Sequence, residues 1–133
     1  MKIADIEGIG PVYATKLAKA GVKTTDALLK KGACPEDRQL LAQASGIGDG
    51  LILEWVNLAD LYRIKGVGSE YSDLLEEAGV DTVVELANRV PENLLAKMTQ
   101  TNNEKNLVNK MPGLKQVKRW VAQAKKLHRV VTY

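Results

Sequence analysis

Pairs of glycines stand directly before helix-forming stretches of this chain, and they are the residues best placed to do chemistry. In Gly8-Ile9-Gly10 and Gly46-Ile47-Gly48, the missing Cβ atoms let the backbone turn sharply and approach another molecule closely. A helix that begins after such a turn presents unpaired N–H groups and the positive end of its dipole, a suitable seat for a phosphate. The first turn is followed by Val12, Lys16 and Lys19. We therefore predict a phosphate contact there, against the alternative that the glycines only connect two packed helices.

Side chains typical of enzymes and metal sites are scarce. Cys34 is the only cysteine and His128 the only histidine, and neither a paired-cysteine spacing nor a His-Glu-x-x-His pattern occurs. The glycine turns do not match a nucleotide site, because no Gly-Lys-Ser/Thr follows them and no strand pattern precedes them. We expect no catalysis, no metal, no cofactor and no small-molecule substrate.

The composition indicates a cytoplasmic protein without a membrane span. A single cysteine allows no internal disulfide, which fits a reducing compartment. Asp5 and Glu7 lie within the first eight residues, where a signal peptide would be basic and then apolar. No stretch approaches the ~20 apolar residues that a membrane helix needs.

A duplication covers most of the chain. A shift of 58 residues aligns Ile6 to Thr24 with Ile64 to Thr82, and it matches glycines, a tyrosine, a leucine and a threonine. Each copy then closes on a Trp-Val pair, at Trp55 and at Trp120, which is a shift of 65 residues. A period of about 60 residues with small insertions indicates a duplicated module.

The duplication predicts two all-α modules, over residues 1–62 and 63–133, with about eight short helices in total. Gly21 and Gly79 stand where a left-handed residue ends a helix. Thr82 begins the next helix and forms a capping box with Glu85. The third and fourth helices are expected to begin near Pro35 and Gly48 in the first copy and near Pro91 and Leu114 in the second.

The first turn, Gly8-Ile9-Gly10-Pro11-Val12-Tyr13-Ala14, resembles the helix-hairpin-helix motif. Gly46-Ile47-Gly48 before Leu51-Ile52-Leu53 looks like a second hairpin, and the spacing is similar to that of the tandem domain at the N-terminus of archaeal recombinases. Gly66-Val67-Gly68 opens the second module in the same way. Met111-Pro112-Gly113 keeps one glycine where the pattern expects two.

Over nearly its full length, the chain also resembles an uncharacterised bacterial and archaeal domain family built from this duplicated unit. The resemblance implies a fold and no established activity. Helix-hairpin-helix motifs hold the DNA backbone through their amides, sometimes with a monovalent cation on the hairpin carbonyls, and they read no base. The resemblance to this motif therefore implies non-specific, salt-sensitive binding of DNA, with dissociation constants of about 10⁻⁴ to 10⁻⁶ M. DNA glycosylases with this motif carry a catalytic lysine where this chain has Val12 and Glu70, so catalysis is not implied.

The charges around the other two turns favour packing over phosphate. Asp49 directly follows the second turn and can compete for its amides, although Gly46 and Gly48 stay candidates for phosphate contact. The helix after the third turn is acidic and would repel a phosphate, so Gly66 and Gly68 are predicted to be structural. Its acids are Glu70, Asp73, Glu76 and Glu77.

A basic segment follows this acidic one. Residues 67–92 contain seven acids and one base, a net charge of −6, and residues 93–133 contain nine bases and one acid, a net charge of +8. On the last helix, Lys115, Lys118 and Arg119 share one face and are candidate nucleic-acid contacts. The alternative is a solvated face, or one that pairs with the acids.

These observations predict a protein that binds DNA or another nucleic acid through backbone contacts of the first module. The alternative is a protein–protein interaction or self-association domain in which the glycine turns serve only the fold.

Overall fold

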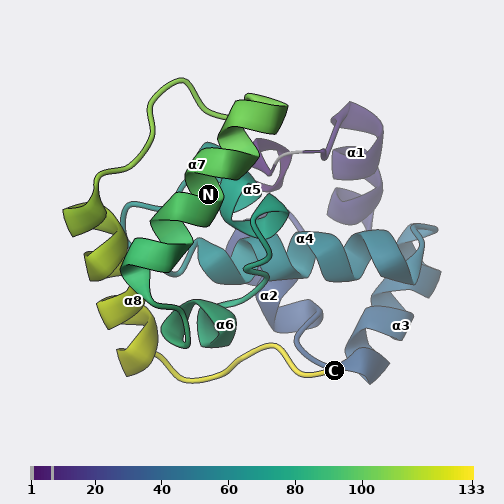
Figure 1. The fold of residues 1–133 in the computed structure, drawn as a ribbon. Helices are drawn as coiled ribbons and strands as arrows, with labels where there is room; N and C mark the ends of the chain where they lie inside the picture. Colours follow the sequence, from purple (N-terminus) through teal and green to yellow (C-terminus); the bar gives the residue numbers. More distant parts are fainter. Residues whose placement is uncertain (1, 7) are drawn as a thin grey trace. The chain divides into compact units, whose positions relative to one another are not determined.

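The computed structural model describes residues 2–6 and 8–133, and over this range the all-α prediction is confirmed. A short 3-10 helix, η1 (Ile3–Asp5), precedes the α-helices (Figure 1). In chain order these are α1 (Pro11–Lys19), α2 (Thr25–Lys31), α3 (Pro35–Ser45), α4 (Asp49–Leu61), α5 (Ser69–Glu77), α6 (Val83–Ala87), α7 (Pro91–Lys105) and α8 (Leu114–Lys126). The described residues contain no β-strand, and a single isolated bridge joins Lys2 and Thr24. Within the same range, every helix is too short or too polar to cross a bilayer.

The chain divides into two compact units. Unit 1 comprises Met1–Asp60 together with Val130–Tyr133, and unit 2 comprises Leu61–Arg129. The last four residues therefore belong with unit 1. There the N–H of Thr132 donates to the carbonyl of Ala33 at 2.8 Å.

The duplicated start and stop signals form the same local structures in both units. Gly21 and Gly79 have φ angles of +88° and +97° just after α1 and α5, the left-handed conformation that glycine adopts most easily. The hydroxyls of Thr24 and Thr82 accept the third amide of α2 and α6, at 3.1 and 3.4 Å. Side-chain caps of this kind typically contribute about 1 kcal/mol each.

A second pair of caps closes α1 and α5 at their C-terminal ends. Lys31 Nζ donates to the carbonyl of Ala20 at 3.3 Å, and Arg89 Nη2 donates to the carbonyl of Gly79 at 2.8 Å. Both bases approach the negative end of a helix dipole, which favours positive charge. Lys31 and Arg89 are also related by the 58-residue shift, so this contact is part of the duplication.

Each unit has its own core of aliphatic side chains around one tryptophan. In unit 1, Trp55 on α4 is only 2 % exposed, and in unit 2 Trp120 on α8 is 1 % exposed. In unit 2, α8 packs against α6 and α7, and α7 also packs against α5. The buried side chains that surround Trp120 in this core include Leu74, Leu75, Val83, Leu86, Leu94, Met98, Val117 and Val121.

Unit 2 has a loop between α7 and α8 where unit 1 has its second glycine turn. α7 ends at Lys105, and its C-cap, Asn106, has φ +51°. Asn102 then organises the loop, because its Oδ1 accepts the N–H groups of Leu107 and Val108 at 2.8 and 2.9 Å and its Nδ2 donates to the carbonyl of Val108 at 3.1 Å. The longer α7 and this loop explain why the sequence around Met111 keeps only one glycine.

Candidate nucleic-acid interface

The first glycine turn connects η1 to α1 and is anchored by a buried side chain. Gly8 has φ +90°, and the N–H of Ile9 donates to the carbonyl of Ile6 at 3.1 Å. The Ile9 side chain is buried, whereas Gly8 and Gly10 are exposed. The turn therefore serves the fold through Ile9 and presents its two glycines to solvent.

α1 begins with amides that have no partner among residues 2–6 and 8–133. Gly10 is the N-cap and supplies no side-chain cap, and Pro11 has no N–H. The N–H groups of Gly10, Val12 and Tyr13 donate no hydrogen bond within the described chain, and Val12 is 67 % exposed. At the start of α2, by contrast, the hydroxyl of Thr24 occupies this position. The start of α1 is thus an open set of donors at the positive end of a helix dipole.

The folded chain itself does not require a glycine at position 10. Gly10 has φ −84° and ψ −179°, an extended conformation that any residue adopts, and nothing lies within 4 Å of the place where a Cβ would stand. Gly32 shows the opposite situation, because its Cβ would lie 2.5 Å from the side chain of Val56. At Gly10 the missing side chain leaves the amides uncovered and leaves room for an external group to reach them.

Lysines follow these amides along α1. Val12, Lys16 and Lys19 line a groove of about 390 Å³. The ammonium of Lys16 lies 6.0 Å from the ring centroid of Tyr13, the outer limit for a cation–π contact. A second groove of about 310 Å³ is bordered by Lys2 and Lys23. These lysines therefore lie along the second half of α1 and beside it, and Lys16 is the nearest of the α1 lysines in sequence to the open amides.

The contribution of Tyr13 to this site was missed from the sequence. Its amide is one of the open donors and its ring lies under Lys16. The spacing of three residues between Tyr13 and Lys16 was a usable signal, because such residues are neighbours on a helix.

The second glycine turn uses more of its amides internally. Gly46 has φ +71° and ends α3, and its N–H donates to a carbonyl of α3 at 2.9 Å. The N–H of Ile47 donates to Ser45 Oγ at 3.2 Å. Gly48 is exposed before α4, and Asp49 is the first residue of that helix, where its carboxylate accepts no hydrogen bond from the described residues. A negative charge at this position opposes a phosphate even without a capping bond.

The third turn repeats the geometry of the first. Gly66 has φ +96°, and the N–H of Val67 donates to the carbonyl three residues before it at 3.1 Å. Gly68 is the N-cap of α5 and supplies no side-chain cap. This turn is also held from outside, because Gln123 on α8 accepts the N–H of Lys65 at 3.0 Å and donates to its carbonyl at 3.4 Å. The acids of α5 follow directly, so the geometry is kept while the charge is reversed.

Three acids of α5 form the one group of side chains in the described residues that could hold a hard metal cation. Carboxylate oxygens of Asp73, Glu76 and Glu77 lie within 4.8 Å of one another. Glu77 is paired with Lys105, and this hydrogen bond is the main reason why the pKa of Lys105 is raised. The lysine ammonium thus already supplies positive charge to this cluster.

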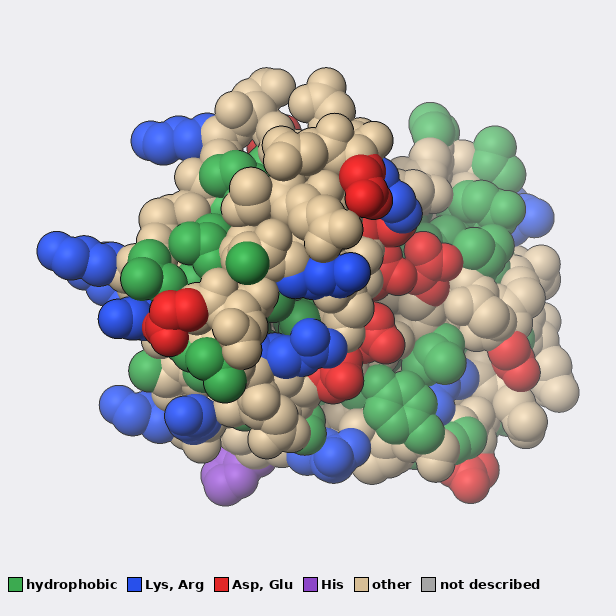
Figure 2. All heavy atoms as spheres, in the orientation of Figure 1, with side chains coloured by type: hydrophobic (Ala, Val, Ile, Leu, Met, Phe, Trp, Pro, Cys, Tyr) green, Lys and Arg blue, Asp and Glu red, His purple; other side chains and the backbone are tan. Residues whose placement is uncertain are grey.

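The predicted basic residues of the last helix lie in unit 2, on α8. Lys115, Lys118 and Arg119 are exposed, and Trp120 faces the core. Figure 2 shows that Lys and Arg side chains predominate along the edge of the molecule where α8 lies in Figure 1. The candidate residues therefore belong to both units: those of the first and second glycine turns lie in unit 1, and those of α8 lie in unit 2.

A family model with the description Domain of unknown function (DUF4332) matches residues 7–127 of the chain. The match extends from the first glycine turn to the last residues of α8. No curated protein and no solved structure has a significant match.

Proposed function

The chain belongs to the family described as Domain of unknown function (DUF4332), and since that description names no activity we propose one: non-enzymatic, non-sequence-specific binding of the nucleic-acid backbone. The observation that carries the proposal is the open start of α1, where the amides of Gly10, Val12 and Tyr13 have no acceptor in the described chain. In this proposal the first turn acts as a helix-hairpin-helix motif.

A phosphate oxygen is the ligand that best suits these donors. Backbone N–H groups at a helix start bind anions through both direct hydrogen bonds and the helix dipole. Lys16 and Lys19 add positive charge along the same groove, and the space beside Gly10 admits the bulk of a phosphodiester. Because such contacts go to phosphate rather than to base edges, they carry affinity without sequence preference.

The test uses Gly10→Asp with Gly68→Asp as its matched control. Both glycines are N-caps with extended φ and ψ, and both have nothing within 4 Å of the Cβ position, so aspartate fits each site. At either site the new carboxylate caps the helix, which stabilises it. At position 10 the same carboxylate occupies the amides and repels phosphate.

Binding to a labelled duplex at low salt should fall at least about tenfold for Gly10→Asp, since charged hydrogen bonds are worth about 1.5 to 3 kcal/mol. Gly68→Asp should bind like the wild-type chain. Equal binding by all three proteins, or no binding by the wild-type chain at low salt, would refute the proposal.

A second candidate, a protein-interaction or self-association domain, is favoured by one observation. The third turn keeps the φ angle and the internal hydrogen bond of the first turn although acids follow it, so the turn serves the fold even without a phosphate. Sedimentation of the chain without nucleic acid distinguishes the two. A concentration-dependent mass that is unchanged by Gly10→Asp would support this candidate.

A further inference from the structure

α8 carries the most strongly basic surface of the chain, and its charges are segregated from its core side. At about 100° per residue, its lysines and arginine fall within an arc of about 120°. Val117, Trp120, Val121 and Ala124 occupy the opposite face and are buried. No acid occurs between Glu104 and the end of the sequence, so nothing on α8 offsets this charge. The exposed bases of α8 and the residues that follow it are Lys115, Lys118, Arg119, Lys125, Lys126 and Arg129.

None of these six bases has an ion pair or hydrogen bond with its side chain among the described residues. Other bases of unit 2 behave differently, since Lys105 pairs with Glu77 and Arg89 lies 3.9 Å from Glu85. Like charges three and four residues apart on a helix, such as Lys115 with Arg119, destabilise it by about 0.2 to 0.5 kcal/mol per pair. The arrangement therefore lowers the stability of the isolated chain, and a polyanionic partner would relieve the repulsion.

The exposed face of α8 carries few of the side chains that other partners need. Protein interfaces depend on a cluster of buried anchors, most often aromatic residues and arginine. In this arc Arg119 is the one residue of an anchor type, no aromatic residue occurs, and the only apolar residue is Ala122. Single-stranded nucleic acid is held largely by stacking of bases on aromatic rings, and Trp120 is buried against the core. A regular row of phosphates is the partner that this face fits.

We propose that α8 is a second contact with the backbone of duplex nucleic acid, formed by the point charges of Lys115, Lys118 and Arg119 and extended by Lys125 and Lys126. This inference rests on the proposed function but uses a different surface and a different interaction. Lys115 and Lys126 lie about 16 Å apart along the helix axis, at 1.5 Å per residue. Over that length, a duplex presents about nine phosphate charges, so several bases can be neutralised together.

The two surfaces must respond differently to salt. Each lysine or arginine that neutralises a phosphate releases condensed counterions, and log K then falls by about 0.9 for each tenfold rise in salt. Amides carry no net charge, so the amides at the start of α1 contribute affinity with little salt dependence. Lys16 and Lys19 contribute to the slope of log K against log salt equally in every variant that keeps them. A change of slope on removing α8 lysines therefore reports on α8, and a change of affinity at constant slope reports on the amides of the turn.

The experiment measures this slope for a labelled duplex with the full chain and three variants. Lys115→Gln/Lys118→Gln should lower the slope by about 1.8 and the affinity at 0.1 M salt by about 60-fold, as two contacts of this strength require. Lys30→Gln/Lys97→Gln removes the same charge from exposed positions outside α8 and should leave the slope unchanged. Gly10→Ser adds a neutral cap and should lower the affinity at an unchanged slope.

The outcomes separate the two proposals. If Lys115→Gln/Lys118→Gln leaves the slope at its wild-type value, the α8 contact is refuted, whatever the result for Gly10→Ser. If the slope falls as expected and Gly10→Ser has no effect, the α8 contact stands and the turn of unit 1 is not a phosphate site. Tighter binding of the wild-type chain to single strands than to duplex would also refute the α8 proposal. If Lys115→Gln/Lys118→Gln loses binding to poly-glutamate but binds duplex like the wild-type chain, the α8 proposal is refuted in favour of an acidic protein partner.

Discussion

The ring of Tyr13 lies 5.1 Å from that of Trp55, measured between centroids, and the rings are inclined by 61°. Tyr71 and Trp120 repeat this contact in unit 2, at 5.3 Å and 55°. In each unit the tyrosine comes from the helix after a glycine turn and the tryptophan from the helix that ends the duplicated segment. The aromatic pair thus connects the beginning of each copy to its end. The contact is kept although the second copy has additional residues between its tyrosine and its tryptophan, which is why the repeat shift changes from 58 to 65 residues.

The two tyrosines should differ in the importance of their hydroxyls. Tyr71 Oη donates to the carbonyl of Lys110 at 2.9 Å, whereas Tyr13 Oη has no hydrogen-bond partner in the described residues. Tyr71→Phe should therefore lower the free energy of unfolding by about 1 kcal/mol, and Tyr13→Phe should leave it nearly unchanged. Urea unfolding of both variants gives the comparison.

Replacing either ring by leucine provides the control for the aromatic contact. Tyr13→Leu should cost about 1 kcal/mol, because edge-to-face ring pairs contribute about 0.5 to 1.5 kcal/mol beyond their buried area. Tyr71→Leu should cost about 2 kcal/mol, because it loses the hydrogen bond as well. Equal losses for the two phenylalanine variants would show that the bond to Lys110 contributes nothing in solution.

Gly8 and Gly10 should respond in opposite ways to alanine. Gly8 has φ +90°, where a Cβ is strained, so Gly8→Ala should destabilise the chain by about 1 to 3 kcal/mol. Gly10 has an extended conformation and open space around it, so Gly10→Ala should cost at most about 1 kcal/mol through the weaker N-cap. Thermal unfolding at constant pH measures both losses.

The third turn supplies the internal control. Gly66 has φ +96°, and its added Cβ would lie 3.2 Å from Trp120 Nε1, compared with 3.8 Å between Gly8 and Trp55 Nε1. Gly66→Ala should therefore be at least as destabilising as Gly8→Ala. A milder effect at position 66 would mean that the tryptophan moves away easily and that backbone strain alone sets the cost.

Most helix boundaries could be predicted because their signals are local. Pro35 and Pro91 are the first residues of α3 and α7, and Thr82 caps α6 as expected. The loop before α8 could not be predicted in this way. It depends on hydrogen bonds from Leu107 and Val108, which follow α7, to the side chain of Asn102 within that helix. The caps from Lys31 and Arg89 were predictable in part. The 58-residue shift aligns the two bases, but it does not show which carbonyls they reach.

The candidate site was predictable only as a set of residue types. Glycines followed by lysines indicated where a phosphate could bind, but the exposure of the amides at Gly10 depends on whether another helix covers them. That is a property of the fold, and no local pattern reports it. The assignment of the first turn to unit 1 and of Lys115 to unit 2 likewise comes from the contacts within each unit.

Arg38 should hold the end of the chain on unit 1. It is buried, and it donates to the carbonyl of Gly32 at 2.8 Å and to that of Thr132 at 2.7 Å. Its guanidinium also lies 5.9 Å from the ring centroid of Tyr133. Arg38→Met keeps the aliphatic stem but leaves both carbonyls without this donor, so the free energy of unfolding should fall by about 2 kcal/mol.

The same variant should release the terminal residues. Amide hydrogen exchange at Thr132, whose N–H donates to the carbonyl of Ala33, should become much faster in Arg38→Met. Tyr133→Phe is the control, because it removes the bond from Tyr133 Oη to Asn57 at 3.0 Å, keeps Arg38 and should have a smaller effect. Undiminished protection of Thr132 in Arg38→Met would show that other contacts hold the tail.

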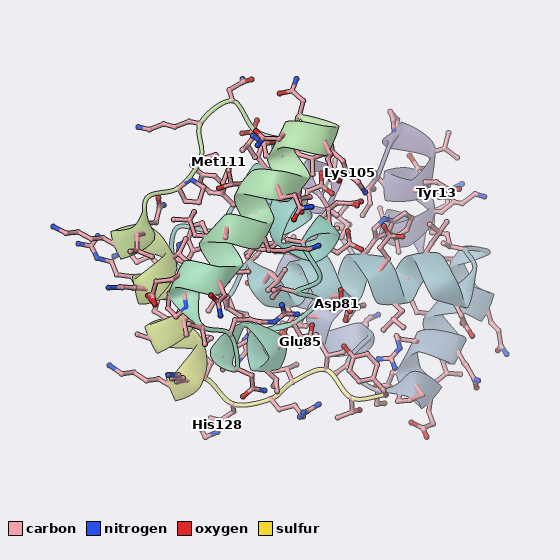
Figure 3. The ribbon with its side chains drawn as sticks, in the orientation of Figure 1. Tyr13, Asp81, Glu85, Lys105, Met111 and His128 are labelled. Carbon is pink, nitrogen blue, oxygen red and sulfur yellow. The ribbon has the colours of Figure 1, made fainter. Side chains whose placement is uncertain are left out.

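Asp81 should make the stability of unit 2 depend on pH. Asp81 and Glu85 lie beside each other at the start of α6 (Figure 3), and the N–H of Asp81 donates to Glu85 Oε2 at 3.4 Å. In a capping box, the side chain of Glu85 would accept the backbone N–H of the N-cap, Thr82. Here it accepts the N–H of the preceding residue, Asp81, instead. Burial raises the pKa of Asp81 above its ordinary value of 3.8, the charge of Glu85 raises it further, and Arg89 opposes both effects.

Because the folded chain holds this proton more tightly than the unfolded chain, ionisation of Asp81 favours unfolding. The contribution of Asp81 to stability is fully present below pH 3.8 and is lost as the pH rises through the higher pKa of the folded state. Asp81→Asn cannot ionise, so it should unfold at a higher temperature than the wild-type chain at neutral pH. The difference should shrink as the pH falls toward and below 3.8, which melting curves over this pH range would show.

Glu85→Gln tests the cause of this pH dependence. Without the Glu85 charge the pKa of Asp81 should move back toward its ordinary value, so Asp81→Asn should stabilise the Glu85→Gln chain less than it stabilises the wild-type chain. NMR titration of the Asp81 carboxyl in both backgrounds measures the pKa directly. A gain from Asp81→Asn that is the same at every pH would mean that side-chain shape, and not the charge of Asp81, controls stability at this helix start.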